Sequence, residues 1–399
     1  MPLNISLMEN NIGKDDINKL CDFLQGTDRF TQGPQVQAFE AAWSKWLGHR
    51  HSVFVNSGSS ANLVTLLALS EKMNLPRQGE VITSPLNWSS DIASIFLAGF
   101  KPRFIDIDFK TLAMSPSLLE TAKTPNTLAV LLTHILGFSG MTETMEVLLQ
   151  TLELPLIEDV CESHGATYKN QKLGTLGLAS NFSFYYAHHM TTIEGGMIST
   201  SDDDFYDLCR RIRSHGLLRE AATTSAQEAF KSERPDLNQD FIFTHLGLNV
   251  RSTELNAVLG LNQLTSLDER IDRRNKNATQ LYSQLNSDTF YTDFRFEGMS
   301  NYAFVIMLNP NQSQKWKDQA MTRLKAFLHS ENIEFRQGTS GGGNMLRQPF
   351  IQKRLGPIDL ADFPNVEHVH NYAVYVGNYP SLCEDKIQGF IEGLNGILS

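Results

Sequence analysis

The chain has 399 residues, 41% hydrophobic and 20% charged, which is typical of a soluble globular protein with one large domain or two domains of ordinary size. Its net charge of -10 offers no basic patch and argues against nucleic-acid binding. No apolar run reaches the roughly 18 residues of a membrane span, and the first residues lack the pattern of a signal peptide, so we expect a cytoplasmic protein.

The spacing of the four cysteines excludes several classes of metal and disulfide site. Cys21, Cys161, Cys209 and Cys383 are far apart and form no C-x-x-C pair. This spacing argues against a disulfide framework, a zinc site and an iron–sulfur cluster. We therefore expect no metal site.

Short apolar segments alternate with helical patterns through the first half of the chain. The predicted strands are residues 51–58, 80–85, 102–108, 127–135 and 154–160. The predicted helices between the first of them are residues 60–73 and 88–100. This alternation predicts a doubly wound α/β fold with a mostly parallel sheet, in which the loops at the carboxyl ends of the strands build the site.

The pattern changes near residue 250. Residues 251–285 predict one or two long amphipathic helices, and 301–308 and 333–337 predict strands on either side of a helix near 315–330. We therefore expect a large α/β domain over 1–245. A smaller C-terminal α+β domain with a long linking helix is expected over 246–399. The polar segment 219–240 is predicted to be an exposed excursion.

Four stretches of the sequence fit a phosphorylated pyridine cofactor. In NSGSSANL, residues 56–63, a strand runs through small residues into a helix, so Gly58, Ser59 and Ser60 are candidates to cradle a phosphate. Such a turn is also a common structural device. In LNWSSD, residues 86–91, Trp88 sits where a flat ring can stack on a cofactor, although a core tryptophan is the alternative.

A third stretch, LIEDVCESHGA, ends an apolar strand on two carboxylates, Glu158 and Asp159. A carboxylate there would keep a pyridine nitrogen protonated and make the ring an electron sink. An N-cap role for Asp159 is the alternative.

The fourth stretch is SFYYAHHMTTIEGG, residues 183–196. Ser183 is a candidate to donate to the phosphate, and His188 is a candidate to face the reactive carbon of the cofactor. A lone histidine is more often structural than catalytic, and only the surrounding pattern favours function here.

These stretches resemble the StrS/DegT family of pyridoxal-phosphate (PLP) nucleotide-sugar aminotransferases, which have the fold-type I PLP-dependent transferase architecture. The family carries S-F-x-x-x-K-x-x-T-x-G-E-G-G. The matching residues here are Ser183, Phe184, Thr191, Glu194, Gly195 and Gly196. The chain departs from the pattern at the lysine position, His188, and at Ile193. The resemblance also extends to RFTQGPQVQAFE, HGLLRE and GLNVRSTELNAVLGLNQL.

The resemblance implies further site residues. Residues 158–163 resemble the corresponding strand end of relatives with a histidine, which adds Glu162 to the cofactor-binding residues. Asn249 would reach a cofactor phosphate across a homodimer with shared active sites. His215 and Arg219 would face the substrate. Arg336 and Arg347, around the glycine-rich loop at 339–344, are candidates for the nucleotide diphosphate, with an ordinary flexible loop as the alternative.

A histidine at the lysine position is typical of one branch of the family, the sugar 3-dehydratases, and the chain resembles that branch. A histidine cannot bond covalently to PLP, so the cofactor can rest as the free amine, pyridoxamine phosphate (PMP). The resemblance implies a PMP-dependent removal of the C3 hydroxyl from a nucleotide-linked 4-keto-6-deoxy sugar in deoxysugar and surface polysaccharide biosynthesis. His188 would be the acid and base, and glutamate the amino donor. Iron–sulfur relatives add a cysteine cluster that is absent here, so no reductase partner is expected.

Two alternative functions remain open, together with the roles of two neighbouring histidines. A nucleotide-sugar aminotransferase would need another lysine, and Lys169 and Lys172 are the nearest in sequence. A PLP-binding protein without turnover would also tolerate the loss of the lysine. His189 is the neighbour of His188, and we expect it to have a supporting or structural role, with His164 as a weaker candidate for the site.

Overall fold

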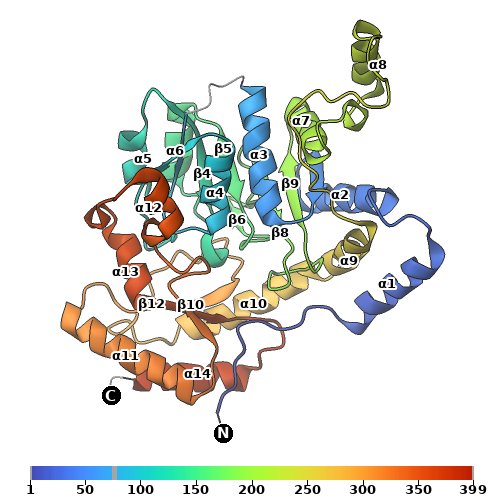
Figure 1. Ribbon diagram of the computed structural model, residues 1–399. Helices are drawn as coiled ribbons and strands as arrows, with labels where there is room; N and C mark the ends of the chain where they lie inside the picture. The colour runs from blue at the N-terminus through green and yellow to red at the C-terminus, as the bar shows by residue number, and fades with distance from the viewer. Residues whose placement is uncertain (1, 74–78, 398–399) are drawn as a thin grey trace.

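The computed structural model describes residues 2–73 and 79–397 (Figure 1). Its centre is a seven-stranded sheet with the order β1-β9-β8-β5-β4-β2-β3. In chain order its strands are β1 (His51–Val55), β2 (Glu80–Thr83), β3 (Lys101–Phe104), β4 (Thr127–Thr133), β5 (Leu156–Asp159), β8 (Ala179–Ser183) and β9 (Gly196–Thr200).

Most of this sheet is parallel. The four pairings from β8 to β3 are parallel, whereas β9 runs antiparallel to both β1 and β8. The central strand β5 is buried at every residue, as expected for a parallel strand covered on both faces. β3 is shorter than the predicted strand 102–108, because the chain leaves the sheet after Phe104 and Ile107 pairs with Met114 instead.

Helices cover both faces of the sheet and create two apolar cores. On one face lie α3 (Gly58–Lys72), α4 (Ser89–Leu97) and α7 (Asp203–Arg213). On the other lie α2 (Pro34–Leu47), α5 (Pro116–Ala122), α6 (Glu143–Leu152) and α9 (Glu254–Leu264). Trp43 of α2 is fully buried among phenylalanines at the centre of the second core.

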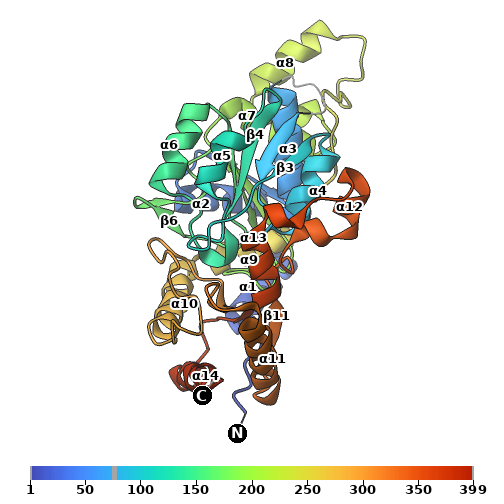
Figure 2. The same ribbon diagram turned by 90° about the vertical axis from the view of Figure 1, so that its left-hand side faces the viewer.

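A smaller α+β unit follows. Its antiparallel sheet has the order β10-β12-β11, formed by β10 (Ala303–Met307), β11 (Phe335–Gln337) and β12 (Ala373–Gly377). The helices of this unit are α11 (Gln314–Ser330), α12 (Pro349–Leu355), α13 (Pro364–Tyr372) and α14 (Glu384–Gly396). In Figures 1 and 2, α11 and α14 lie below the large sheet, at the end of the molecule where both the first and the last described residues are found.

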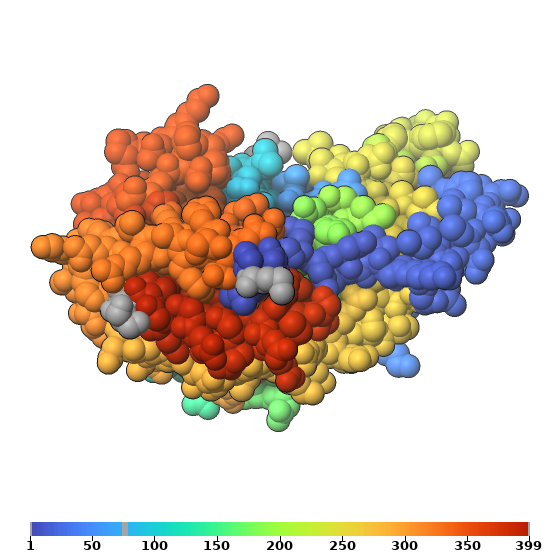
Figure 3. All heavy atoms as spheres, turned by 90° about the horizontal axis from the view of Figure 1, so that it is seen from below, coloured from blue at the N-terminus to red at the C-terminus, as the bar shows by residue number. Residues whose placement is uncertain are grey.

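Two segments connect the large sheet with the small unit. The predicted helical region 251–285 forms two helices, α9 and α10 (Leu267–Tyr282), and α10 runs toward the smaller sheet. Residues before α1 (Lys14–Gly26) cross the face of the small unit, where Ile5 pairs with Ile333 (Figure 3).

The remaining regular structure is local. A two-stranded ribbon is formed by β6 (Thr167–Tyr168) and β7 (Gln171–Lys172), and α8 (Thr224–Glu233) projects away from the body of the molecule (Figure 1). Short 3-10 turns occur at Ile135–Gly137, Leu218–Glu220, Met345–Arg347 and Leu360–Asp362. Within residues 2–73 and 79–397, no helix combines the length and apolar character needed to cross a membrane.

Candidate active site

A cavity of about 400 Å³ lies at the carboxyl ends of the parallel strands, between the large sheet and the small unit. Eight of the residues predicted from the sequence line it. They are Gly58, Ser59, Trp88, Asp159, Glu162, Ser183, His188 and Arg336. The N-terminal segment contributes Leu7 and Met8, and the small unit contributes Tyr302, Ser340 and Tyr375.

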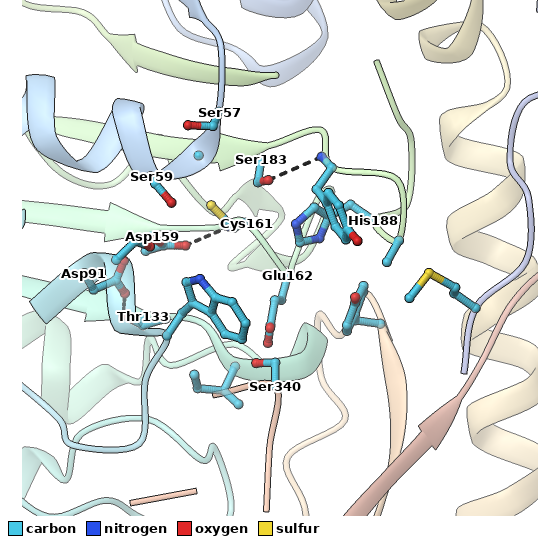
Figure 4. Close-up of a pocket in the computed structure, with 18 of the residues that line it drawn as sticks. Ser57, Ser59, Asp91, Thr133, Asp159, Cys161, Glu162, Ser183, His188 and Ser340 are labelled. Carbon is cyan, nitrogen blue, oxygen red and sulfur yellow. Dashed lines mark hydrogen bonds between the residues drawn. The ribbon is translucent and has the colours of Figure 1, made fainter. Parts of the chain in front are cut away.

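The start of α3 forms one end of the cavity. Ser57 caps the helix, and its side chain accepts a hydrogen bond from the Ser60 N–H at 3.1 Å. A Cβ atom on Gly58 would lie only 2.7 Å from Cβ of Ser183 and 3.1 Å from Sγ of Cys161, so only glycine leaves this end open. Figure 4 shows Ser57, Ser59 and Ser183 together here.

The structure differs from the sequence prediction at one serine of this turn and adds another. The Ser60 hydroxyl donates to Asn56 Oδ1 at 2.6 Å and does not line the cavity, so it stabilises the turn that starts the helix. Ser57 lines the cavity instead, although the sequence analysis did not single it out. Ser57 could have been identified from its N-cap position, because it directly precedes the glycine at which the helix begins.

Asp159 and Glu158 end the same strand but have different surroundings. Glu158 is fully buried and accepts hydrogen bonds from the backbone N–H groups of Gly174, Leu176 and Gly177 at 2.8 to 3.1 Å, which is a structural role. Asp159 faces the cavity, and its Oδ1 accepts the N–H of Cys161 at 2.9 Å. Alternation of side chains along the strand explains why only one of the two carboxylates reaches the cavity.

Three further polar residues surround Asp159, and sequence reasoning missed them. Asn62 Nδ2 donates to Asp159 Oδ2 at 2.9 Å and also to Asp91 Oδ1. The Thr133 hydroxyl donates to Asp91 Oδ2 at 2.9 Å. Asp91 ends the quoted stretch LNWSSD, but only the fold shows that the first turn of α4 brings it beside the end of β5.

Trp88 is not a core residue. It is 51% exposed, sits at the N-cap of α4 and lines the cavity. Its backbone N–H donates to the side chain of Asn87 at 2.8 Å, which fixes the turn before the helix. An exposed indole ring at the mouth of a cavity is available for stacking on a flat ligand.

His188 lies on the loop between β8 and β9, across the cavity from Asp91 and Asp159 in Figure 4. Its backbone N–H donates to the Tyr185 carbonyl at 3.0 Å, and its carbonyl accepts from Asn11 Nδ2 at 2.9 Å. The ring packs against Tyr302 with centroids 5.5 Å apart, and Nδ1 is buried without a hydrogen-bond partner among the described residues.

Burial lowers the pKa of His188 to about 4, against the raising effect of the Asp159 charge and with a smaller lowering effect of Arg274. The imidazole is therefore neutral at pH 7 and able to accept a proton. His164 and His189 are fully buried behind it and do not line the cavity. His189 Nε2 contacts the Ser300 carbonyl at 3.1 Å.

Glu162 is a second titratable group in the cavity. Its Oε2 accepts the Leu136 N–H at 2.9 Å, and the Ser340 hydroxyl also donates to it. Burial raises the pKa of Glu162 to about 7 despite these hydrogen bonds.

Several predicted residues lie outside this cavity in the single chain. Arg347 pairs with Glu367, to which its Nε donates at 2.9 Å, and Arg219 lies over the ring of Phe241 at 5.9 Å. His215 and Asn249 also do not line it. Asn249 was predicted to reach the cavity of a partner chain, so its position in a single chain does not test that prediction.

The two lysines considered as alternatives lie elsewhere. Lys169 Nζ donates to Glu146 at 2.7 Å on the surface, and Lys172 Nζ lies 3.9 Å from the ring centroid of Trp46. None of the described residues that line the cavity is a lysine.

Comparison with known proteins gives relatives over nearly the whole chain. GDP-4-keto-6-deoxy-D-mannose 3-dehydratase of Escherichia coli O55:H7 is 32% identical over 366 residues, 90% of this chain and 91% of that protein. The protein of the same name in Yersinia pseudotuberculosis is 29% identical over 392 residues, 97% of each chain.

A solved structure of the E. coli 3-dehydratase with bound hydrated PLP has a TM-score of 0.87 and 28% identity, covering 99% of this chain and 100% of that one. This match confirms the predicted architecture of a PLP-dependent transferase with a large, mostly parallel sheet and a small C-terminal unit. The family model described as the DegT/DnrJ/EryC1/StrS aminotransferase family matches residues 10–395. The chain therefore belongs to the DegT/DnrJ/EryC1/StrS aminotransferase family.

Proposed function

We propose that this chain is a 3-dehydratase that uses PLP and PMP to remove the C3 hydroxyl group of a nucleotide-linked 4-keto-6-deoxy sugar. One observation carries the proposal: the cavity holds a buried, neutral imidazole, His188, and no lysine among its described lining residues. Relatives named as 3-dehydratases of a GDP-linked keto sugar support it.

The lining residues fit a phosphorylated pyridine. Gly58, Ser57 and Ser183 offer an open cradle of hydroxyl and backbone groups at the start of α3, as a phosphate requires. Asp159 offers a buried acceptor for a protonated ring nitrogen, and Trp88 offers a flat surface for the ring.

When bound, PMP supplies an amine for the C4 ketone of the sugar and a protonated ring that accepts electrons. His188 accepts the proton from C4′ of the cofactor and donates a proton to the departing C3 oxygen. Because none of the described lining residues is a lysine that could deliver a proton to C4 of the sugar, loss of the hydroxyl is favoured over amination. We propose glutamate as the donor that restores the amine form.

The substrate side of the cavity is formed by the small unit. Arg336 lines it with Ser340 and Tyr375, and we propose that its guanidinium contacts the nucleotide diphosphate. Arg347 is already paired with Glu367, so a diphosphate would have to displace that carboxylate to reach it. The product of such a reaction is a deoxysugar for surface polysaccharides.

We further propose that Asn249 serves the cavity of a second copy in a homodimer. In its own chain, Asn249 accepts a hydrogen bond from Arg251 Nε at 3.2 Å and does not line the cavity. A dimeric mass by light scattering, together with weaker PLP binding in Asn249→Ala, is the expected result. A fully active monomer contradicts this part of the proposal.

The central test uses the purified protein with PLP, glutamate and a panel of nucleotide-linked 4-keto-6-deoxy sugars. We expect PMP to form from PLP and glutamate, borohydride to leave no cofactor mass on the chain, and ammonia to be released with a keto sugar. A stable amino sugar as the main product contradicts the proposal, and so does the absence of any turnover across the panel.

His188→Lys tests the role of the imidazole. We expect the new amine to bond to PLP, so that borohydride fixes the cofactor to the chain, and C3 deoxygenation to fall by at least about 100-fold, the scale of a lost general base. His51→Lys is the matched control, because His51 pairs with Asp203 at the surface and does not line the cavity. Dehydration by His188→Lys at the wild-type rate removes His188 from the proposed mechanism.

A further inference from the structure

Two buried carboxyl groups lie side by side on one wall of the cavity (Figure 4). Asp91 is completely buried and Asp159 is 4% exposed. Asn62 bridges the two side chains by donating from Nδ2 to one oxygen of each. They come from different elements, since Asp91 lies in the first turn of α4 and Asp159 ends β5.

The donors around this pair are neutral. Asp159 accepts the Cys161 N–H and Asp91 accepts the Thr133 hydroxyl, each at 2.9 Å. The charged groups that act on Asp91 are acids, Asp159 and Glu162. The thiol of Cys161 also faces the pair, and burial keeps it neutral by raising its pKa well above the ordinary value.

Two adjacent buried carboxyl groups without a cation cannot both ionise, so one of them keeps its proton. Burial, followed by the charge of Asp159, raises the pKa of Asp91 well above its ordinary value. Asp91 is also the more deeply buried of the two, at 0% exposed against 4% for Asp159. The proton therefore belongs on Asp91 and the charge on Asp159.

We propose that Asp91 is a positioning residue: a neutral carboxylic acid that donates a hydrogen bond to Asp159 and holds it, together with Asn62, toward the ring nitrogen of the cofactor. This inference rests on the proposed function for the identity of the ligand. The pair then carries one negative charge, which matches the one positive charge of a protonated pyridine. Asp91 acts through Asp159 and does not itself take part in proton transfer.

The protonation state can be tested without cofactor. Infrared difference spectra between the cofactor-free wild type and Asp91→Asn at pH 7 are expected to show the loss of one protonated carboxyl stretch in the variant, whereas the band of partly protonated Glu162 is common to both proteins and cancels. Glu162→Gln serves as the comparison, because Glu162 is the other carboxyl group of the cavity with a raised pKa. If Asp91→Asn removes a carboxylate band instead, Asp91 is ionised and the proposal is wrong.

The positioning role is tested by PLP affinity and by the absorption band of the protonated ring. We expect PLP to bind about threefold more weakly in Asp91→Asn, which keeps a donor toward Asp159, and at least about tenfold more weakly in Asp91→Leu, which loses it. Asp159→Asn should show the largest loss of PLP affinity and a changed absorption band of the protonated ring. Equal losses in Asp91→Asn and Asp159→Asn, or none in Asp91→Leu, overturn the proposal.

Asp106→Asn is the matched control for the affinity series. Asp106 is also buried with a raised pKa, but it accepts the N–H groups of Asn365 and Val366 and does not line the cavity. Thermal unfolding of each cofactor-free variant separates misfolding from weakened binding. Failure of the wild type to bind PLP contradicts the proposed function, whereas the infrared result still decides the protonation of Asp91.

Discussion

At the scale of single residues, the environment of His188 matters as much as its identity. An ordinary histidine has a pKa of about 6.5 and is partly charged near neutral pH. Burial among His164, Tyr302 and the loop backbone lowers the pKa of His188 to about 4, so the ring is neutral near pH 7. The residue type is visible in the sequence, but its burial depends on residues far away in the chain.

This shift predicts a pH dependence of stability. Unfolded His188 takes up a proton as the pH falls through about 6.5, but folded His188 does so only near 4, so the folded state loses stability over that interval. Relative to His188→Asn, the wild-type protein should lose about 3 kcal/mol of unfolding free energy between pH 6.5 and 4. Urea denaturation of the cofactor-free proteins measures this, with His51→Asn as the surface control. If the wild type and His188→Asn lost the same unfolding free energy over this pH range, the lowered pKa of His188 would be wrong.

At the scale of elements, the turn from β1 into α3 limits what can stand at position 58. In Gly58→Ala, the new methyl group would press on Ser183 and Cys161, so we expect PLP to bind at least about tenfold more weakly. The matched control is Gly26→Ala at the end of α1, where an added Cβ meets nothing within 4 Å. Equilibrium titration with PLP measures both, and unchanged affinity in Gly58→Ala would show that the end of the cavity near Ser183 does not hold the phosphate.

Some elements of both sheets could be predicted from local patterns. The strands from β1 to β5 and the helices α3 and α4 follow from apolar runs separated by helical periodicity. The excursion at 219–240 is exposed as predicted, but it contains α8, a helix with no buried residue, and such a helix leaves no apolar stripe to detect. The end of β3 depends on the pairing of Ile107 with Met114, and no local sequence pattern predicts that pairing.

The site was harder to predict than the fold. Residues next to a recognisable stretch, such as His188 and Ser183, were identified from the sequence and line the cavity. Asn62 and Asp91 were missed because their role exists only where α3, α4 and β5 meet. Leu7 and Met8 were missed because the N-terminal segment reaches the cavity from outside both sheets.

At the scale of the whole molecule, Arg274 anchors the connecting helix α10 to the small unit. It is fully buried, and its Nη1 donates to the Tyr302 carbonyl at 2.8 Å and to the Asn378 carbonyl. Arg274→Met leaves these carbonyls without a donor, so we expect a loss of about 3 kcal/mol of unfolding free energy. Because the charge of Arg274 lowers the pKa of His188, that pKa should also rise in the variant.

Arg273→Met is the control for this experiment. Arg273 pairs with Glu384 at 3.3 Å on the surface, where an ion pair contributes about 0 to 1 kcal/mol. Denaturation gives the unfolding free energies, and NMR of the imidazole protons gives the pKa. Equal stability of the two variants would show that the buried guanidinium does not stabilise the junction.

The segment before α1 has a practical consequence. Ile5 pairs with Ile333, Leu7 and Met8 line the cavity, and Asn11 holds the loop that carries His188. A preparation clipped by a protease near its amino end would keep both sheets and still lose the part of the cavity wall that Leu7 and Met8 form. Low turnover in such a sample would then report damage during purification, so the intact mass should be checked before any assay is interpreted.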